Sequence, residues 1–147
     1  MKRYWLLAAL MLLCTPAFAW TTQKSTVIDA VTLDADPTSV NSDSVYAGGL
    51  EALSFDVIYD ETEVGGIQVA ITLQASYDNS VWIAASFYDY AGGATLQTSE
   101  TLTADSTGYI LWVNKDLCVP YYRVVVTATG SDADDTAVIT AYASMRG

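Results

Sequence analysis

Residues 67–77 read IQVAITLQASY, and their side chains alternate between two kinds along the whole stretch. The apolar set consists of Ile67, Val69, Ile71, Leu73, Ala75 and Tyr77, whereas the intervening set is mostly polar. A period of two places the two sets on opposite faces of an extended strand. The stretch therefore predicts an antiparallel strand with one face against a core and the other toward solvent.

The same alternation recurs along the chain, and no stretch shows helical periodicity over three turns. Turn-forming residues separate the apolar runs, notably the Gly-Gly pairs at 48–49, 65–66 and 92–93 and the segment Asp78-Asn79-Ser80. The expected strands cover residues 26–33, 53–59, 67–77, 81–88, 96–102, 109–113, 121–128 and 136–143. About eight strands rich in Val, Ile, Thr and Tyr predict an all-β fold, an antiparallel two-sheet β-sandwich that is jelly-roll-like.

Residues 1–19 have the features of a secretory signal peptide. Lys2 and Arg3 precede an apolar stretch, and Ala17-Phe18-Ala19 matches a small-x-small cleavage pattern. We expect cleavage after Ala19, a flexible leader at residues 20–25 and a single β-sandwich domain at residues 26–147. The protein would then be secreted or periplasmic, or lie on an extracellular or virion surface, with no membrane insertion after cleavage.

The chain is strongly acidic. Loss of Lys2 and Arg3 with the signal peptide leaves four basic residues against seventeen acidic ones, a net charge of −13. Such a charge repels nucleic acid, so we expect no nucleic-acid partner. Cys118 would be the single remaining cysteine and could form no internal disulfide. Its apolar neighbours favour burial, and pairing with another chain is the alternative.

The absence of histidine limits the chemistry that this chain can perform. It excludes Ser-His-Asp and Cys-His catalysis, histidine general bases and the usual zinc sites. A pair of carboxylates could still act on a glycosidic bond, but seventeen acidic residues offer many pairs without specificity. We therefore expect that the protein is not an enzyme and uses no cofactor.

Calcium is the one candidate ion, because it takes carboxylate and carbonyl oxygens as ligands. Asp132, Asp134 and Asp135 place three carboxylates within four residues, although not at EF-hand spacing. A solvated hairpin tip is the alternative, since aspartate is common in turns for local reasons.

Aromatic side chains provide the other candidate recognition surface. The alternation in residues 81–88 places Val81, Ile83, Ala85 and Phe87 toward the core and turns Trp82 and Tyr88 outward. Aromatic rings on an exposed sheet or loop can stack on sugar rings, whereas buried rings fill a sandwich core. The candidate ligand-binding residues are Trp82, Tyr88, Tyr90 and Trp112.

Two segments carry a resemblance to known families. An alternating strand runs into Ser76-x-Asp78-x-x-x-Trp82, and Pro120 later leads into an aromatic-Arg-Val strand at residues 121–126. This order resembles that of discoidin-type, galactose-binding-like jelly-roll modules, and of small jelly-roll proteins from phages and other surface assemblies. The resemblance implies a jelly-roll fold but no particular ligand-binding residue. It departs from the discoidin pattern in reading Asp-Asn instead of Asp-Gly at the turn, and in lacking a closing disulfide.

These features favour a secreted, non-catalytic structural or surface-assembly subunit, such as a component of a filament, coat or virion. Its partners would be other proteins or further copies of itself. The alternative is a carbohydrate-binding module with a glycan as its ligand. A small hydrolase that uses two carboxylates is the third candidate.

Overall fold

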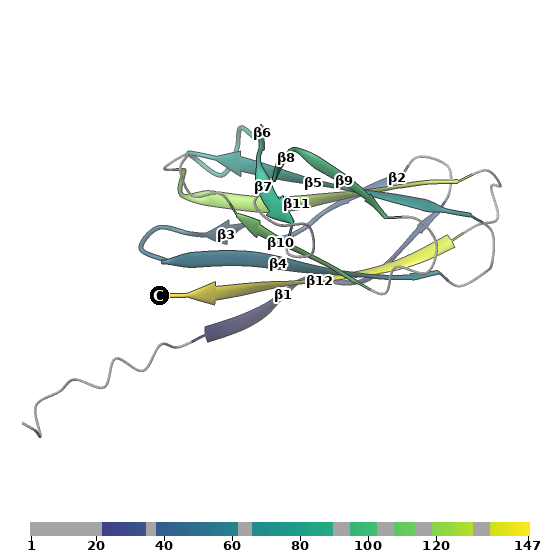
Figure 1. Ribbon diagram of the computed structural model, residues 1–147, viewed down its shortest axis with the longest axis horizontal. Helices are drawn as coiled ribbons and strands as arrows, with labels where there is room; N and C mark the ends of the chain where they lie inside the picture. Colours follow the sequence, from purple (N-terminus) through teal and green to yellow (C-terminus); the bar gives the residue numbers. More distant parts are fainter. Residues whose placement is uncertain are drawn as a thin grey trace, which may run out of the picture.

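The computed structural model describes residues 22–34, 38–61, 66–89, 95–102, 108–113, 119–130 and 136–147. Within these residues every regular element is a β-strand, and the strands form two antiparallel sheets stacked face to face (Figure 1). The predicted all-β, antiparallel two-sheet sandwich is therefore confirmed.

One layer, sheet A, has six strands, and their order in space is β1 (Thr22–Asp34), β12 (Thr136–Arg146), β4 (Ala52–Glu61), β10 (Tyr109–Val113), β7 (Phe87–Asp89) and β8 (Leu96–Gln97). The other layer, sheet B, is centred on β11 (Tyr121–Thr129) and β5 (Gln68–Ser76). Two short strands pair with β11 along its other edge, β2 (Thr38–Asn41) and β3 (Val45–Tyr46). Two more pair with β5 in the same way, β6 (Ile83–Ala85) and β9 (Ser99–Leu102).

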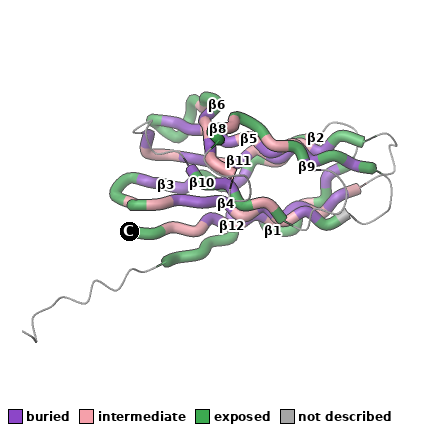
Figure 2. Tube along the Cα trace, in the orientation of Figure 1, coloured by how far each residue is buried: buried purple, intermediate pink, exposed green. Residues whose placement is uncertain are grey.

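The core lies between the two sheets and follows the alternation in the sequence (Figure 2). In β5 the apolar set is fully buried, and β11 buries Tyr122, Val124, Val126 and Ala128 in the same manner. On sheet A, Ala143 and Ala141 of β12 lie beside Phe55 and Val57 of β4. Small residues beside large ones allow the larger side chains to fill the space between the layers.

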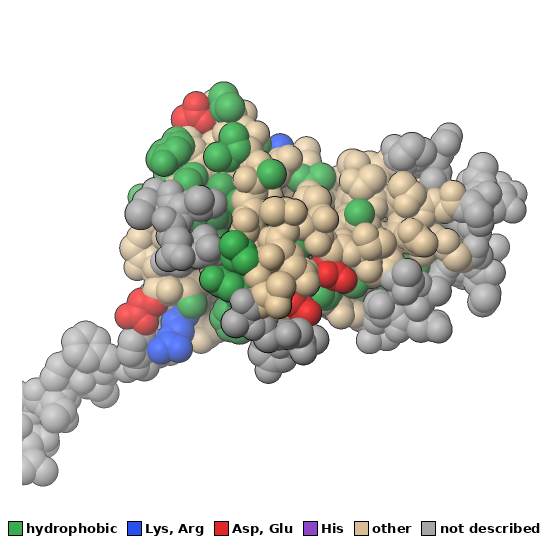
Figure 3. Space-filling model, turned by 45° about the horizontal axis from the view of Figure 1, so that its top comes forward, with side chains coloured by type: hydrophobic (Ala, Val, Ile, Leu, Met, Phe, Trp, Pro, Cys, Tyr) green, Lys and Arg blue, Asp and Glu red, His purple; other side chains and the backbone are tan. Residues whose placement is uncertain are grey.

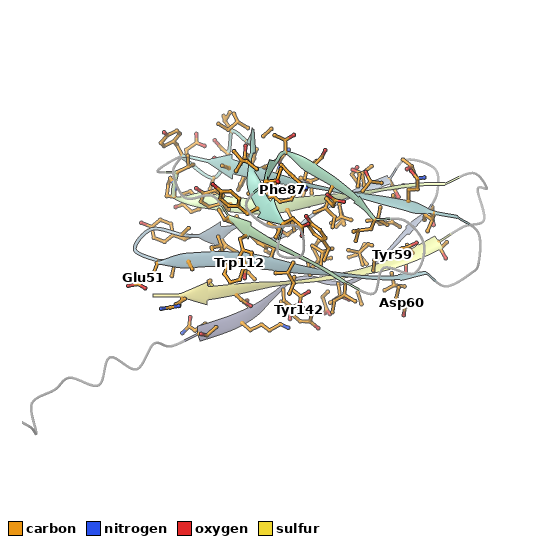
Figure 4. The ribbon with its side chains drawn as sticks, in the orientation of Figure 1. Glu51, Tyr59, Asp60, Phe87, Trp112 and Tyr142 are labelled. Atoms are coloured by element: carbon orange, nitrogen blue, oxygen red, sulfur yellow. The ribbon has the colours of Figure 1, made fainter. Side chains whose placement is uncertain are left out.

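Tyr59 of β4 also connects the two layers. Its ring is buried between the sheets, as is that of Phe87, whereas Asp60 points away from the core (Figure 4). The hydroxyl of Tyr59 donates a hydrogen bond to the carbonyl oxygen of Ile67 at 3.2 Å. A buried hydroxyl thereby finds the partner that it needs away from water.

The described residues form twelve strands, more than the expected eight, for two reasons. The short strands β2 and β3 carry too few residues for a clear alternation. The expected strands 81–88 and 96–102 each break, so that β6 and β9 belong to sheet B while β7 and β8 belong to sheet A. The chain thus crosses between the sheets at Ser86 and again at Thr98, on the same side of the sandwich.

The crossing corrects one expectation about the core. Val81 and Ile83 were predicted to be buried, but their exposed fractions are 68% and 52%. Val81 belongs to the turn before β6, and Ile83 begins a three-residue strand at the edge of sheet B. The prediction of burial is correct for Ala85 and Phe87, which flank the crossing point.

Strand β1 begins at Thr22 and therefore includes residues that we expected in a flexible leader. Thr22–Thr26 pair with the end of β12 although all five side chains are exposed. Lys24 strengthens this pairing, since its Nζ lies 3.7 Å from Asp56 and 4.0 Å from the ring centroid of Tyr142. The first residues of β1 that pack into the core are Val27 and Ile28, two consecutive buried residues at a bulge in the strand.

Candidate functional site

The carboxylate of Asp78 organises the turn between β5 and β6. Its Oδ1 accepts hydrogen bonds from the backbone N–H groups of Ser80 at 2.9 Å and Val81 at 3.0 Å. The hydroxyl of Ser76 donates a further bond to the same atom at 3.0 Å. Because these bonds favour the ionised carboxylate, above all the one from Val81, the pKa of Asp78 lies well below its ordinary value. The polar residues of this stretch therefore form a hairpin turn.

Trp82 lies on the outer face of sheet B, stacked on Arg123. The guanidinium carbon of Arg123 is 4.2 Å from the centroid of the indole ring, a cation–π contact. Arg123 alternates with buried Tyr122 and Val124, so its side chain points outward from β11. Its Nε donates a hydrogen bond of 2.9 Å to Oε1 of Gln74 on the neighbouring strand. Partial burial under the indole lowers the pKa of Arg123 from its usual value.

Exposed apolar side chains gather at the same end of sheet B as this stack, some on its outer face and some on its core-facing side, and we call this group the end patch. It comprises Tyr46, Tyr77, Val81 and Ile83, the half-buried Trp82 and Tyr121, and the charged Arg123 and Asp78. The residues come together because Tyr121 of β11 pairs with Tyr46 on one side and with Ser76 on the other. The rings of Tyr46 and Tyr121 meet edge to face with centroids 5.3 Å apart. Figure 3 shows hydrophobic side chains gathered at this end of the molecule, at the upper left of the view.

Tyr88 and Trp112 lie on the opposite side of the sandwich, on the outer face of sheet A. They are direct cross-strand neighbours in the pairing of β7 with β10. Trp112 is 39% exposed, and Ile110, on the same face of β10, is exposed as well. Figure 4 labels Trp112 on this strand. The structure thus brings two of the candidate binding residues together and separates both from Trp82.

The remaining candidates lie outside the described residues. These are Tyr90, the proposed calcium ligands Asp132, Asp134 and Asp135, the predicted signal peptide at residues 1–19, and Cys118. Within the described ranges, no three acidic or cysteine side chains come together in a way that could hold a metal ion. The same ranges contain no helix that is long and apolar enough to span a membrane.

A shallow hollow of about 250 Å³ is lined by Gly66, Gln68, Thr129 and Gly130. None of these four residues carries a titratable side chain, so they provide no acid, base or charged nucleophile. Elsewhere in the described chain, Tyr109 has a pKa well above its ordinary value because of burial and the nearby carboxylates of Asp89 and Glu100. These surroundings favour the protonated phenol of Tyr109 over the phenolate.

No protein-family model matches this chain, and no curated protein matches it. The sequence resemblance to discoidin-type modules thus has no support from those comparisons. Solved structures do match. The crystal structure of SPBc2 prophage-derived protein YomS is similar with a TM-score of 0.59 and 13% identity, over 87% of this chain and 95% of that one. The structure of infectious bursal disease virus Gx strain matches with a TM-score of 0.53 and 10% identity.

The second match covers 86% of this chain but 33% of the viral chain, so it concerns one part of a larger protein. At such low identity both likenesses describe the fold. The same kind of sandwich therefore occurs in a prophage-derived protein and in a virus.

Sequence reasoning missed most of the end patch. Arg123, Tyr46 and Tyr77 were not among the candidate residues, although Tyr77 directly precedes the Asp78 turn. Tyr77 was assigned to the apolar face of its strand, yet it is 70% exposed because β5 ends at Ser76. Arg123 could have been noticed as one of few basic residues, standing in an otherwise apolar strand. Its stacking on Trp82, however, depends on tertiary structure.

Proposed function

We propose that this protein is an exported, non-catalytic β-sandwich subunit that joins a larger body, such as a filament, coat or virion, by binding other protein chains. The observation that carries the proposal is the end patch. Seven large apolar side chains are exposed among the described residues, and Tyr46, Tyr77, Val81 and Ile83 are four of them. Their concentration at one end distinguishes them from the scattered exposed apolar residues of an ordinary surface.

The composition of the end patch suits contact with another protein. Tyrosine, tryptophan and arginine are enriched at the centres of protein interfaces, and Tyr46, Tyr121, Trp82 and Arg123 supply all three types. Trp82 and Arg123 are already stacked, so little side-chain entropy would be lost when a partner covers them. The occurrence of this sandwich in a prophage-derived protein and a virus supports an assembly role, as does the lack of histidine.

Fractionation of material from the producing cells tests this function. Extracellular material is separated on a density gradient and probed with an antibody against the chain. We expect the chain to sediment with large particles and to remain there after a wash in high salt. A chain found only in the light, soluble fractions would contradict the proposal.

Glycan binding is a second candidate, favoured by the adjacency of Tyr88 and Trp112. Cross-strand neighbours on one face of a sheet lie about 5 Å apart, which brings their two rings side by side. Aromatic surfaces of this kind can stack on the apolar face of a sugar ring, and the half-buried Asp56 provides a polar group on the adjacent strand.

A glycan array followed by fluorescence titration tests the second candidate. The binding of any sugar that is found should be lost in Trp112→Ala and retained in Trp82→Ala, because the two indoles lie on opposite sheets. Equal loss in both variants, or no response on the array, would reject this candidate.

A further inference from the structure

We propose that the partner of the end patch is a second copy of this chain, bound through a two-fold symmetric contact in which Arg123 of each copy faces Asp78 of the other. This inference rests on the proposed function and specifies its partner. It is carried by the chemistry of the patch, which presents an apolar surface together with one positive and one negative group.

Arg123 is a cation with no acidic partner in the part of the chain that the structure describes. Among the described residues it forms no salt bridge, and its contacts are the amide oxygen of Gln74 and the ring of Trp82. The other two described basic side chains, Lys24 and Arg146, each lie within 4 Å of a carboxylate. In a chain with this excess of acidic residues, the unpaired guanidinium is the exception. Its Nη atoms can still donate a bidentate pair of bonds to a carboxylate.

Asp78 is the complementary group. Its carboxylate is exposed, and within the described chain every bond that it accepts comes from an uncharged donor. These bonds keep the group ionised, so its negative charge persists without a nearby cation. One face of the molecule therefore carries both halves of an ion pair, yet no contact within the monomer joins them.

The spacing of the two groups suits a two-fold contact. Arg123 pairs with Gln74 in the sheet, Tyr121 pairs with Ser76, and Asp78 follows Ser76 by two residues. The row of Tyr121 and Ser76 thus lies between Arg123 and the turn that holds Asp78. A two-fold axis that passes between the two charged groups exchanges their positions, as an isologous interface requires. The same operation brings Tyr46 and Tyr121 of one copy, which share the outer face with Arg123, close to those of the other.

The net charge of the chain explains why the charged pair matters. Two molecules that each carry a large negative charge repel one another at long range. A contact through a face whose arginine has no acidic partner among the described residues lowers this repulsion locally. Opposite charges in register also exclude other arrangements of the same apolar surface.

A charge exchange tests the proposal. We expect the chain without its predicted signal peptide to sediment as a dimer in analytical ultracentrifugation. Arg123→Glu and Asp78→Lys should each weaken association by about 100-fold, because each places like charges in contact at both ends of the interface. An equal mixture of the two variants should restore a dimer, now with one copy of each, since both contacts again join opposite charges.

Controls separate assembly from folding. Circular dichroism and thermal melting establish that each variant is folded. Tyr46→Ser, which removes an exposed ring beside Tyr121 on the outer face, should weaken the dimer while the variant remains folded, whereas Gln23→Ser on β1 should leave the dimer unchanged. A wild-type monomer at all concentrations would overturn this inference. A dimer that persists in both charge-reversal variants would also overturn it, as would a mixture of the two variants that fails to associate.

The outcome is independent of the broader proposal. A chain that sediments with particles from cells but remains monomeric when purified would keep the assembly role and reject the homodimer. A purified chain that forms a dimer but is absent from any particle would support the homodimer and reject the assembly role.

Discussion

The role of Asp78 can be predicted from the residues next to it in the sequence. The segment Asp78-Asn79-Ser80 predicts a turn, and the structure forms one, with Asn79 in the left-handed region at φ 61°. The outward direction of Trp82 also follows from the sequence. Its partner Arg123 does not, because that contact joins residues far apart in the chain.

Replacement of Asp78 by asparagine should produce a pH-dependent loss of stability. Asparagine keeps a side-chain oxygen for the turn but removes the negative charge, which the hydrogen bonds of the folded state favour. The pKa of Asp78 is lower in the folded state than the value of about 3.9 in an unfolded chain. The advantage of the wild type over Asp78→Asn should therefore be complete above about pH 5 and shrink as the pH falls below about 4.

Urea unfolding of both proteins across that pH range measures the difference. An advantage that stayed constant with falling pH would show that the carboxylate is not stabilised by the turn.

Strand β1 and the edge of sheet B at β6 show where the alternation of apolar and polar residues within one strand gives a wrong prediction. Alternation reports which residues face a core, but it does not report to which sheet a strand belongs. The segment 81–88 therefore reads as one strand although it crosses between sheets at Ser86. Bulges disturb the pattern further, as at Val27 and Ile28 of β1, where two neighbours are buried together. Tertiary pairing decides both features.

Ser42 lies between β2 and β3 and bonds to β11 where neither strand does. Loss of its hydroxyl should therefore destabilise the fold. Its hydroxyl accepts a hydrogen bond of 3.0 Å from the backbone N–H of buried Val124. Ser42→Ala leaves that N–H unpaired and should lower the free energy of unfolding by about 1–3 kcal/mol. Ser39→Ala on the exposed part of the same edge should change it by less than about 0.5 kcal/mol. Equal effects of the two substitutions, measured by chemical denaturation, would contradict this role.

Ala30 carries backbone strain that glycine should relieve. Its φ of 45° lies in the left-handed region, which costs a residue with a Cβ about 1–2 kcal/mol. After the entropic cost of glycine, Ala30→Gly should raise the free energy of unfolding by about 0.5 kcal/mol. Ala84→Gly in β6, whose φ is negative, should instead lower it by about 0.5–1 kcal/mol. A destabilised Ala30→Gly protein in the same denaturation experiment would disprove the strain.

At the scale of the molecule, the sequence predicted the class of fold and the outward direction of Trp82 and Tyr88, but not the surface that we propose for assembly. The end patch is built from β3, the β5–β6 turn and the start of β11, three segments that only the sheet brings together. The candidate pair Tyr88 and Trp112 arises in the same way, through pairing of β7 with β10. Each of these surfaces depends on strand order, and strand order cannot be read from periodicity.

A photo-crosslink from the end patch in living cells tests the assembly role most directly. A photoreactive phenylalanine derivative replaces Tyr77, which is exposed in the isolated chain, and a second protein carries it in place of Thr32 on β1 as a control. We predict that illumination links position 77 to another protein chain in a discrete adduct at high yield, with no comparable adduct from position 32. An equal absence of adducts at both positions would contradict the proposal that this end of the molecule is a protein contact.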